Sequence, residues 1–261
     1  MASREPERVP LDITQYRASD AEQLRTADLL RLMPGQGATA LDLGARDGHF
    51  SLLMAERFDE VTALDLVEPR IEHPKVKCVR GNAVSLPFPD QAFDFVLCAE
   101  VLEHVPAELL KGVCGEIQRV ARDRVLIGVP YKQDVRLGRT TCFSCGRPNP
   151  PWGHVNAFDE ARVIELFSEF GVETVSFVGT SAARTNAVSA ALMDFAGNPY
   201  GTYKQEEPCT HCGRPLVPPP PRNTVQLVAT RLAYWARSVT APFAKPHGVW
   251  MHVVFRRRAD V

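Results

Sequence analysis

Apolar and polar residues follow one another in blocks whose spacing switches between helix-like and strand-like. Residues 19–35 begin with Ser19 and carry Glu22 three positions later, a pair typical of a helix start. Leucines at helical spacing follow, and Pro34 and Gly35 end the block. The short apolar run 40–43 then enters a glycine turn and an amphipathic segment. This order predicts a helix followed by a strand–turn–helix unit.

The same alternation continues through most of the chain. The later segments are expected as strands over 60–69, within 76–106 (two strands), and over 123–131, 172–180 and 248–258, with helices over 107–122 and 159–171. Strands that alternate with helices imply a parallel sheet covered by helices on both faces. We therefore expect an α/β fold.

The first turn has the composition of a ligand-binding turn. Gly44 and Gly48 lack a Cβ atom, so the backbone can approach a ligand closely and adopt positive φ there. Asp42 ends the preceding strand, at the edge where open α/β sheets bind ligands. Asp65 ends the next strand, about twenty residues later, where a carboxylate can accept both hydroxyls of a ribose.

Composition limits the possible partners and compartments. The chain has 261 residues, 45% of them hydrophobic, and a net charge of −1. This balance predicts no general attraction to nucleic acid or to an anionic membrane. The polar N-terminus shows no secretion signal, and no stretch approaches the roughly 18 apolar residues of a membrane helix. We expect a soluble, cytoplasmic protein.

The phrase C-x-x-C-G-R-P occurs twice, with Cys142 and Cys145 in one copy and Cys209 and Cys212 in the other. Two thiolates in such a turn are half of a zinc site, so the four sulfurs predict one structural zinc ion. The halves lie too far apart for a local zinc finger, so the fold must bring them together. Two separate thiol pairs or a disulfide remain alternatives, as does His211 in place of one sulfur.

The run D-L-G-x-x-x-G at 42–48, the acidic Asp65 and the segment "GNAVSLPFPDQAFDFVLCAEVLEHV" together resemble the class I S-adenosylmethionine-dependent methyltransferases, in their small-molecule branch. The resemblance covers roughly residues 20–180 and resumes at the last strand. It implies a doubly wound, mostly parallel seven-stranded sheet of the Rossmann-like methyltransferase fold.

The resemblance also implies a cofactor, S-adenosylmethionine, and the residues that bind it. Those residues are Asp42, Gly44 and Gly48 at the methionine part, Asp65 at the ribose, Asn82 and Ala83 at the adenine, and Glu100 beside the methionine end, with Ala45 and Leu66 as further cofactor-binding residues. Three features depart from the family's pattern. Arg46 replaces the middle glycine of the turn, Asn82 stands where the family often has aspartate, and the link after Asp65 is too short for a crossover helix.

The zinc ligands suggest how the chain is divided. We expect an N-terminal tail over 1–18, a cofactor-binding domain over 19–180 plus 249–258, and an insertion over 181–248 with two helix-like stretches. Because both cysteine pairs follow carboxyl ends of strands, zinc is expected to tie the insertion and the loop 132–158 into one lid.

The expected function is methyl transfer to a small hydroxylated acceptor, such as a sugar or a natural product. His154 is the candidate general base, with Asp134, Asn156 or Asp159 to orient its ring, and Tyr131 and Asp134 are secondary candidates. A structural role for His154 is the alternative. Two further alternatives are a methyltransferase that uses its zinc knuckles to bind a protein or RNA, and a non-catalytic scaffold. The sequence leaves the oligomeric state open.

Overall fold

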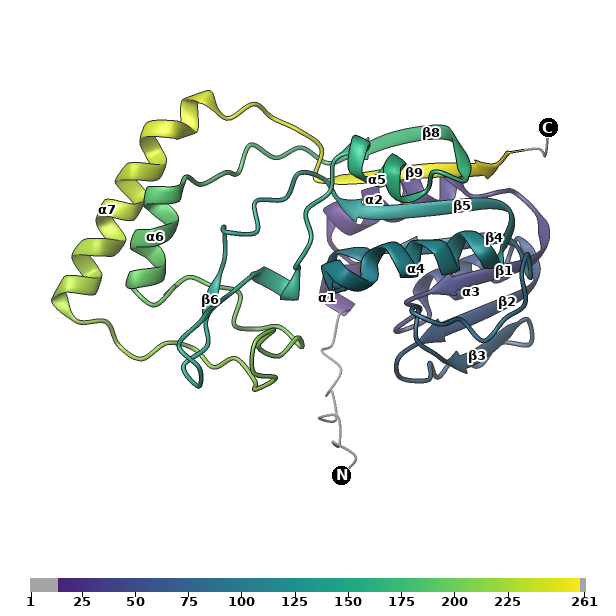
Figure 1. Ribbon diagram of the computed structural model, residues 1–261, viewed down its shortest axis with the longest axis horizontal. Coiled ribbons are helices and arrows are strands. Elements are labelled where there is room, and N and C mark those ends of the chain that lie inside the picture. The colour runs from purple at the N-terminus through teal and green to yellow at the C-terminus, as the bar shows by residue number, and fades with distance from the viewer. Residues whose placement is uncertain (1–13, 259–261) are drawn as a thin grey trace. The chain divides into compact units, whose positions relative to one another are not determined.

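The computed structural model describes residues 14–258, and its largest element is a seven-stranded sheet in the order β3-β2-β1-β4-β5-β9-β8 (Figure 1). Its strands are β1 (Gly37–Leu43), β2 (Phe58–Asp65), β3 (Val76–Arg80), β4 (Phe93–Ala99), β5 (Ala121–Pro130), β8 (Phe170–Val178) and β9 (Trp250–Arg257). Strand β9 runs in the direction opposite to the other six strands, and the remaining neighbours in this sheet are parallel. The expected doubly wound, mostly parallel seven-stranded fold is confirmed.

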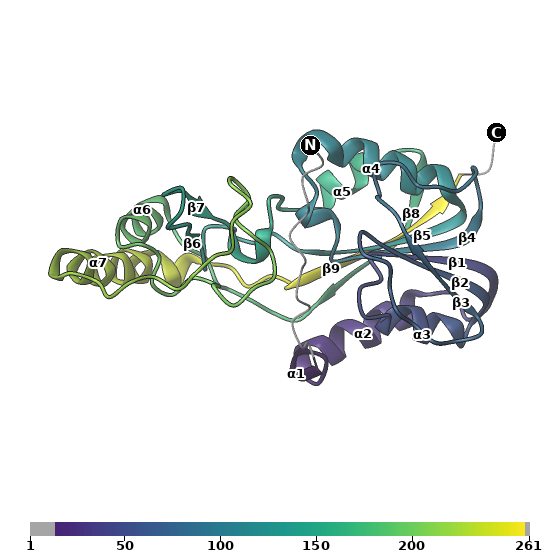
Figure 2. The same ribbon diagram turned by 90° about the horizontal axis from the view of Figure 1, so that it is seen from below.

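Helices cover both faces of this sheet, with α4 and α5 on one side and α2 and α3 on the other (Figure 2). Their bounds are α2 (Asp20–Leu32), α3 (His49–Ala55), α4 (Ala107–Val120) and α5 (Glu160–Leu166), and the short η1 (Leu102–His104) precedes α4. The apolar residues of α4 at 110, 113, 114 and 117 repeat at helical spacing and are all buried. The apolar stripe therefore explains why this helix packs on the sheet.

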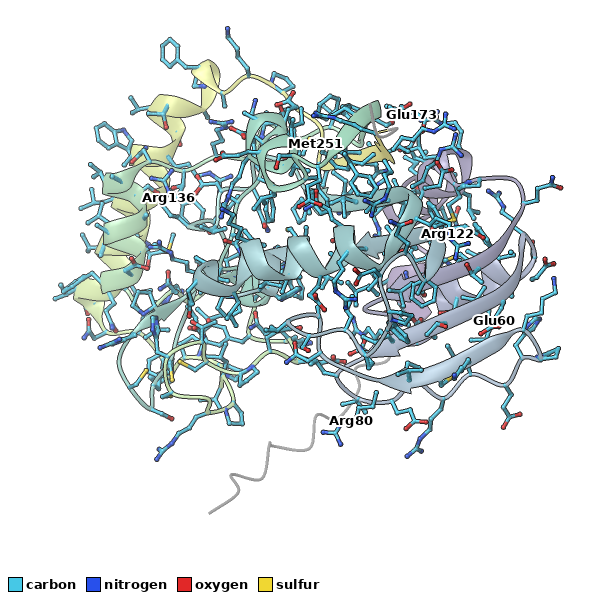
Figure 3. The ribbon with its side chains drawn as sticks, turned by 45° about the vertical axis from the view of Figure 1, so that its right-hand side comes forward. Glu60, Arg80, Arg122, Arg136, Glu173 and Met251 are labelled. Carbon is cyan, nitrogen blue, oxygen red and sulfur yellow. The ribbon has the colours of Figure 1, made fainter. Side chains whose placement is uncertain are left out.

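The strand β9 fills the place between β5 and β8, and Met251 on it is fully buried (Figure 3). The edge strand β8 carries Glu173 (Figure 3). Its carboxylate accepts a 2.8 Å hydrogen bond from Nε of Arg124 on β5. The connection from β2 to β3, residues 66–75, contains no helix although the two strands are parallel neighbours. The short link seen in the sequence therefore joins adjacent strands without a crossover helix.

The chain divides into two compact units. Among the described residues, the larger unit comprises 23–133, 156–180 and 247–258, and holds the seven-stranded sheet. The smaller unit comprises 14–22, 134–155 and 181–246. The division expected from the sequence, with a cofactor-binding domain over 19–180 plus 249–258 and an insertion over 181–248 that forms a zinc-tied lid with the loop 132–158, stays a prediction.

The smaller unit contains two helices that lie side by side, α6 (Ala187–Phe195) and α7 (Thr224–Thr240) (Figures 1 and 2). Its other elements are α1 (Thr14–Arg17), β6 (Thr140–Thr141), β7 (Pro148–Asn149), η2 (Pro151–Gly153) and η3 (Ala241–Phe243). Asn186 caps α6 by accepting from the N–H of Ser189, and its amide nitrogen donates to the Ala236 carbonyl of α7 at 2.9 Å. One side chain thus starts one helix and attaches it to the other.

None of the helices in residues 14–258 combines the length and the apolar character needed to cross a bilayer.

Candidate cofactor site and cysteine cluster

The turn after β1 presents a buried carboxylate. Asp42 is 3% exposed, and Ser51 on α3 donates a 2.6 Å hydrogen bond to its Oδ2. Strand β1 lies between β2 and β4, so the side chain of Asp42 stands at the centre of the sheet's carboxyl edge. Ser51 is a positioning residue for this carboxylate that the sequence analysis did not single out.

Gly44 and Gly48 in this turn have positive φ, and neighbouring side chains leave no room for a Cβ atom at either position. Gly44 has φ +83°, and a Cβ atom there would lie 2.3 Å from Cγ2 of Val101. Gly48 has φ +79°, and its Cβ would lie 2.5 Å from the Ile71 side chain. Arg46 also has positive φ, 45°. The turn therefore keeps a left-handed conformation at the position where arginine replaces glycine, which costs of the order of 1 kcal/mol.

Asp65 lies at the end of β2, beside the end of β1. Its Oδ2 accepts a 2.9 Å hydrogen bond from the backbone N–H of Arg46, and its Oδ1 accepts a 2.6 Å bond from the N–H of Leu66. Leu66 is half exposed, whereas Ala45 is buried and donates its N–H to the Leu64 carbonyl. Asp65 is therefore held in a fixed orientation at the mouth of the turn, and each carboxylate oxygen keeps a further lone pair for a ligand.

The next predicted pair lies after β3. The carbonyl oxygen of the Asn82 side chain accepts from the N–H of Val84 at 3.0 Å, which leaves its amide nitrogen available as a donor to a ligand. Ala83 packs against the core of the sheet. Both residues follow the carboxyl end of β3, and their role at the adenine stays a prediction.

Glu100 follows β4 with φ 58°, and its N–H donates to the Gly128 carbonyl at 2.9 Å. Its Oε2 accepts a 3.3 Å hydrogen bond from the indole N–H of Trp250 on β9. Asp42, Asp65, Asn82 and Glu100 thus come from four strand ends of one sheet, which places all of them at its carboxyl edge.

Sequence reasoning missed a further acidic residue at this edge. Glu103 in η1 has no exposed side-chain surface, and neither of its carboxylate oxygens has a hydrogen-bond partner in residues 14–258. Burial first, and then the charge of Glu100, raise the pKa of Glu103 well above its usual range. The spacing E-x-x-E-H over 100–104 was the signal that could have identified it.

The four predicted cysteine ligands come together in the smaller unit. Their sulfur atoms all lie within 4.8 Å of one another, with 3.7 Å between Cys142 and Cys212 and 3.7 Å between Cys145 and Cys209. Four sulfurs bound about 2.3 Å from a tetrahedral zinc ion would lie about 3.8 Å apart. The separations are far from the ~2.05 Å of a disulfide bond. The cluster therefore fits a tetrathiolate metal site.

The two knuckles have the same backbone pattern. In the first, the N–H of Cys142 donates to the Arg147 carbonyl and Gly146 donates back to the Cys142 carbonyl. In the second, the N–H of Cys209 donates to the Arg214 carbonyl and the N–H of Gly213 donates to the Cys209 carbonyl. Gly146 and Gly213 both have positive φ. The ring of His211 contacts the Pro148 carbonyl at 3.2 Å, so this side chain is engaged outside the cluster. Each phrase C-x-x-C-G-R-P therefore encodes one turn.

The thiol of Cys142 has a lowered pKa. Burial opposes the ionisation of Cys142, but the backbone N–H groups of Cys145 and Ser144 outweigh it and lower the pKa of this thiol to about 6. A thiolate is the form that binds a metal ion. The knuckle geometry thus favours the ligand form of Cys142.

The predicted base, His154, is 7% exposed and follows η2 in the smaller unit, where its N–H donates to the Pro151 carbonyl. The side chains proposed to orient it have other partners. Asn156 donates to the carbonyls of Leu102 and Val105, and Asp159 caps α5.

The remaining candidates near β5 are also engaged. Asp134 accepts from Arg136 at 2.8 Å, and Tyr131 donates to Glu160 at 2.8 Å.

Comparison with known proteins places this sheet edge in context. Residues 41–127 match a family described as methyltransferase domain, and this segment runs from β1 to β5. A demethylmenaquinone methyltransferase from Listeria welshimeri is 29% identical over 160 residues, which are 56% of this chain and 60% of that protein. The chain therefore spans about 60% of the length of this relative.

Two solved structures share the fold at low sequence identity. One belongs to the complex between the Haloferax volcanii Trm112 methyltransferase activator and a methyltransferase, with TM-score 0.53 and 13% identity, covering 94% of this chain and 93% of that chain. The other is a Burkholderia thailandensis 1,6-didemethyltoxoflavin-N1-methyltransferase with bound 1,6-didemethyltoxoflavin and S-adenosylhomocysteine, with TM-score 0.51 and 18% identity, covering 92% and 80%. Residues 41–127 are therefore similar to a methyltransferase domain, and the chain shares the Rossmann-like fold of these two methyltransferase structures.

Proposed function

We propose that the larger unit binds S-adenosylmethionine at the carboxyl edge of its sheet and that the protein is a methyltransferase. The observation that carries the proposal is Asp65, whose carboxylate is fixed between the turn after β1 and the end of β2 by two backbone N–H groups. Its free lone pairs suit the two hydroxyls of a ribose, and the glycine turn beside it admits a ligand close to the backbone.

The bound cofactor would supply a methyl group on a positively charged sulfur, which is open to in-line attack by an acceptor. The chain's residues would position the two reactants. Asp42, held by Ser51, offers a buried negative charge near the amino-acid end of the cofactor. The amide of Asn82 can bond the adenine edge. Glu100 would lie beside the methionine end, because it follows β4 next to the turn after β1.

We further propose a small hydroxylated acceptor and His154 as the general base. The acceptor oxygen would form the new bond to the methyl carbon as the sulfur–carbon bond breaks, and its proton would pass to the imidazole. The unperturbed pKa of a histidine side chain is about 6.5, so its imidazole is largely neutral at cellular pH and can accept the proton. The names of the Listeria relative and of the toxoflavin enzyme refer to small molecules, which supports this class of acceptor.

We also propose one zinc ion held by Cys142, Cys145, Cys209 and Cys212. Four thiolates leave no open coordination position, so its role would be structural.

A second candidate function, methyl transfer to RNA, is favoured by the distribution of charge. Residues 134–155 and 181–246 contain ten Lys or Arg against four Asp or Glu, whereas the rest of the chain contains twenty against twenty-seven. Trp235 is 69% exposed and Tyr200 is 58% exposed in this basic part, and bases can stack on such rings. The neutral net charge read from the whole sequence conceals this separation.

Isothermal titration of the purified protein with S-adenosylmethionine tests the main proposal, since a non-catalytic scaffold with a degenerate site would give no heat. Transfer of a labelled methyl group from the cofactor to a library of small hydroxylated compounds would then identify the acceptor class. A labelled single-stranded RNA that binds with an affinity falling steeply with salt, and that accepts the methyl group, would instead support the second candidate. A protein acceptor would appear as label on a polypeptide.

A further inference from the structure

The carboxylate of Glu103 is buried at the sheet's carboxyl edge, and neither of its oxygens accepts a hydrogen bond from residues 14–258. The side chain is 0% exposed, and both of its oxygens lack a hydrogen-bond partner among the described residues. Native proteins rarely bury an acidic group in this way, because such groups are normally paired, hydrogen-bonded or bound to a metal. Glu103 therefore calls for a partner that residues 14–258 do not supply.

Two other potential metal ligands lie beside this carboxylate. A ring nitrogen of His104 lies within 4.8 Å of a Glu103 carboxylate oxygen. Glu100 precedes Glu103 by three residues, at the end of β4, and its negative charge opposes the ionisation of Glu103. The three residues come from one short stretch, the end of β4 and the turn η1, so their relative positions are fixed by local structure.

Two neighbouring charges act on Glu103 in opposite directions. The buried guanidinium of Arg25 on α2 acts on Glu103 in the direction that favours its ionised form. Glu100 acts in the opposite direction, because two nearby carboxylates repel each other. A bound cation would remove that repulsion and would satisfy the oxygens of Glu103 together.

We propose that Glu100, Glu103 and His104 bind one divalent cation that prefers oxygen ligands, Mg²⁺ or Mn²⁺. Carboxylates and water suit these ions, and one imidazole is compatible with Mn²⁺ in particular. Three protein ligands leave further coordination positions for water or for oxygens of a bound molecule. This site differs from the cysteine cluster in position, in ligand chemistry and in its open coordination.

The cation deepens the proposed function, on which its chemical role rests. Glu100 follows β4, next to the strand end that carries Asp42 and Gly44, so the ion would lie near the methyl donor. A divalent cation can hold an acceptor hydroxyl and lower its pKa, which helps oxygen attack the methyl carbon. The preferred acceptors would then be compounds with two adjacent hydroxyl or carbonyl oxygens that can chelate one ion.

Mn²⁺ binding measured by electron paramagnetic resonance tests the site without any acceptor or turnover. The zinc-replete full chain is titrated with MnCl₂, and the loss of the free-ion signal gives the stoichiometry. We expect one Mn²⁺ per chain, displaced by excess Mg²⁺, and at least tenfold weaker binding in Glu103→Gln and in His104→Ala. The control Glu108→Gln changes an exposed carboxylate on α4 a few residues away and should bind Mn²⁺ like the natural protein.

Cofactor titration on the same samples separates this inference from the proposed function. If the protein binds S-adenosylmethionine but no Mn²⁺, or if folded Glu103→Gln binds Mn²⁺ as tightly as the natural protein, the cation site is wrong and the methyltransferase proposal stands. If Mn²⁺ binds at the predicted residues while the cofactor does not, the cation site stands and the proposed function fails. Circular dichroism confirms that each variant is folded, and His104→Ala provides a second variant that removes no buried charge.

Discussion

The backbone N–H of Arg46 donates a 2.9 Å hydrogen bond to Oδ2 of Asp65, and thereby links the turn after β1 to the end of β2. The bond uses only the main chain of Arg46, so a bulky residue in place of glycine does not prevent it. The left-handed backbone at this position, φ 45°, directs the N–H toward the carboxylate. Arg46 therefore preserves the feature of the turn on which the proposed ribose site depends.

Asp65→Ala should weaken S-adenosylmethionine binding by about 10- to 150-fold, because it removes a charge-assisted contact worth roughly 1.5–3 kcal/mol. Isothermal titration gives the dissociation constant directly. Asp59→Ala is the matched control, since Asp59 is an exposed carboxylate near the other end of the same strand. Equal affinities of the two variants would refute the assignment of Asp65 to the ribose.

Protein purified without added metal should contain one zinc ion per chain, and Cys209→Ser should lower this ratio strongly. The reason is that all four sulfurs lie within 4.8 Å of one another and Cys209 supplies one of them. Mass spectrometry of the metal content measures the ratio. Cys78→Ser, at a cysteine on β3 of the larger unit, should leave it unchanged. Metal that persists in Cys209→Ser would contradict a site shared between the two knuckles.

Zinc removal by a chelator should loosen residues 181–246 before it affects the sheet, because the cluster belongs to the smaller unit. Hydrogen exchange followed by mass spectrometry can report the two units separately. Faster exchange in the strands of the sheet at the same chelator concentration would show that the metal stabilises the whole chain instead.

His154→Ala should lower the rate of methyl transfer by roughly 10²–10⁴-fold, which is the usual contribution of a positioned general base. The affinity for S-adenosylmethionine should stay nearly intact, since the base acts on the acceptor. Single-turnover kinetics with the identified acceptor separates the two effects. A variant that keeps half of the natural rate would establish the structural role of this histidine.

Acid should weaken the larger unit partly through Asp28 on α2. Burial raises the pKa of Asp28, but hydrogen bonds from His252, Arg31 and Ser176 outweigh it and lower this pKa to about 2. The carboxyl is therefore ionised in the folded protein at pH values where it is already protonated in the unfolded chain. Stability from this group is present above about pH 4 and is lost as the pH falls toward 2.

His252, fully buried on β9, acts in the same direction, because burial lowers the pKa of its ring. Below about pH 6.5 the unfolded chain binds a proton that the folded protein does not, so stability again falls with pH. Asp28→Asn should cost about 1.5–3 kcal/mol at pH 7, and its difference from the natural protein should shrink toward pH 2.5. Urea unfolding at several pH values measures this, and a difference that stays constant with pH would contradict it.

Local sequence patterns were sufficient to predict the strand–turn–helix unit around Asp42 and Gly44. The apolar run and the two glycines specify that turn within a few residues, and the duplicated C-x-x-C-G-R-P phrase specifies each knuckle in the same way. The clustering of the four sulfur atoms was also predictable, because two identical half-sites in one chain can bind the same zinc ion.

The burial and the partners of the buried polar residues could not be predicted from local sequence patterns. Glu103 lies in a stretch that reads as an ordinary helix start, and its burial depends on the packing of η1 against the sheet. Asp28 and His252 are 224 positions apart in the sequence, and Nδ1 of His252 lies 2.6 Å from Oδ2 of Asp28. The residues that flank either one in the sequence do not indicate this contact. Such pairs are set by the order of strands and helices in space, and sequence periodicity carries no information about them.

The position of β9 between β5 and β8 has a consequence for the order in which the protein is made. Among the described strands, β8 pairs only with β9, yet residues 179–249 separate the two along the chain. At about 5–20 residues per second, a ribosome needs roughly 4–14 s to synthesise that stretch. During this time β8 has no strand to pair with, while both cysteine pairs and both helices of the smaller unit are completed. Pairing of β8 with β9 can therefore start only after the residues of the insertion, 181–246, have been synthesised.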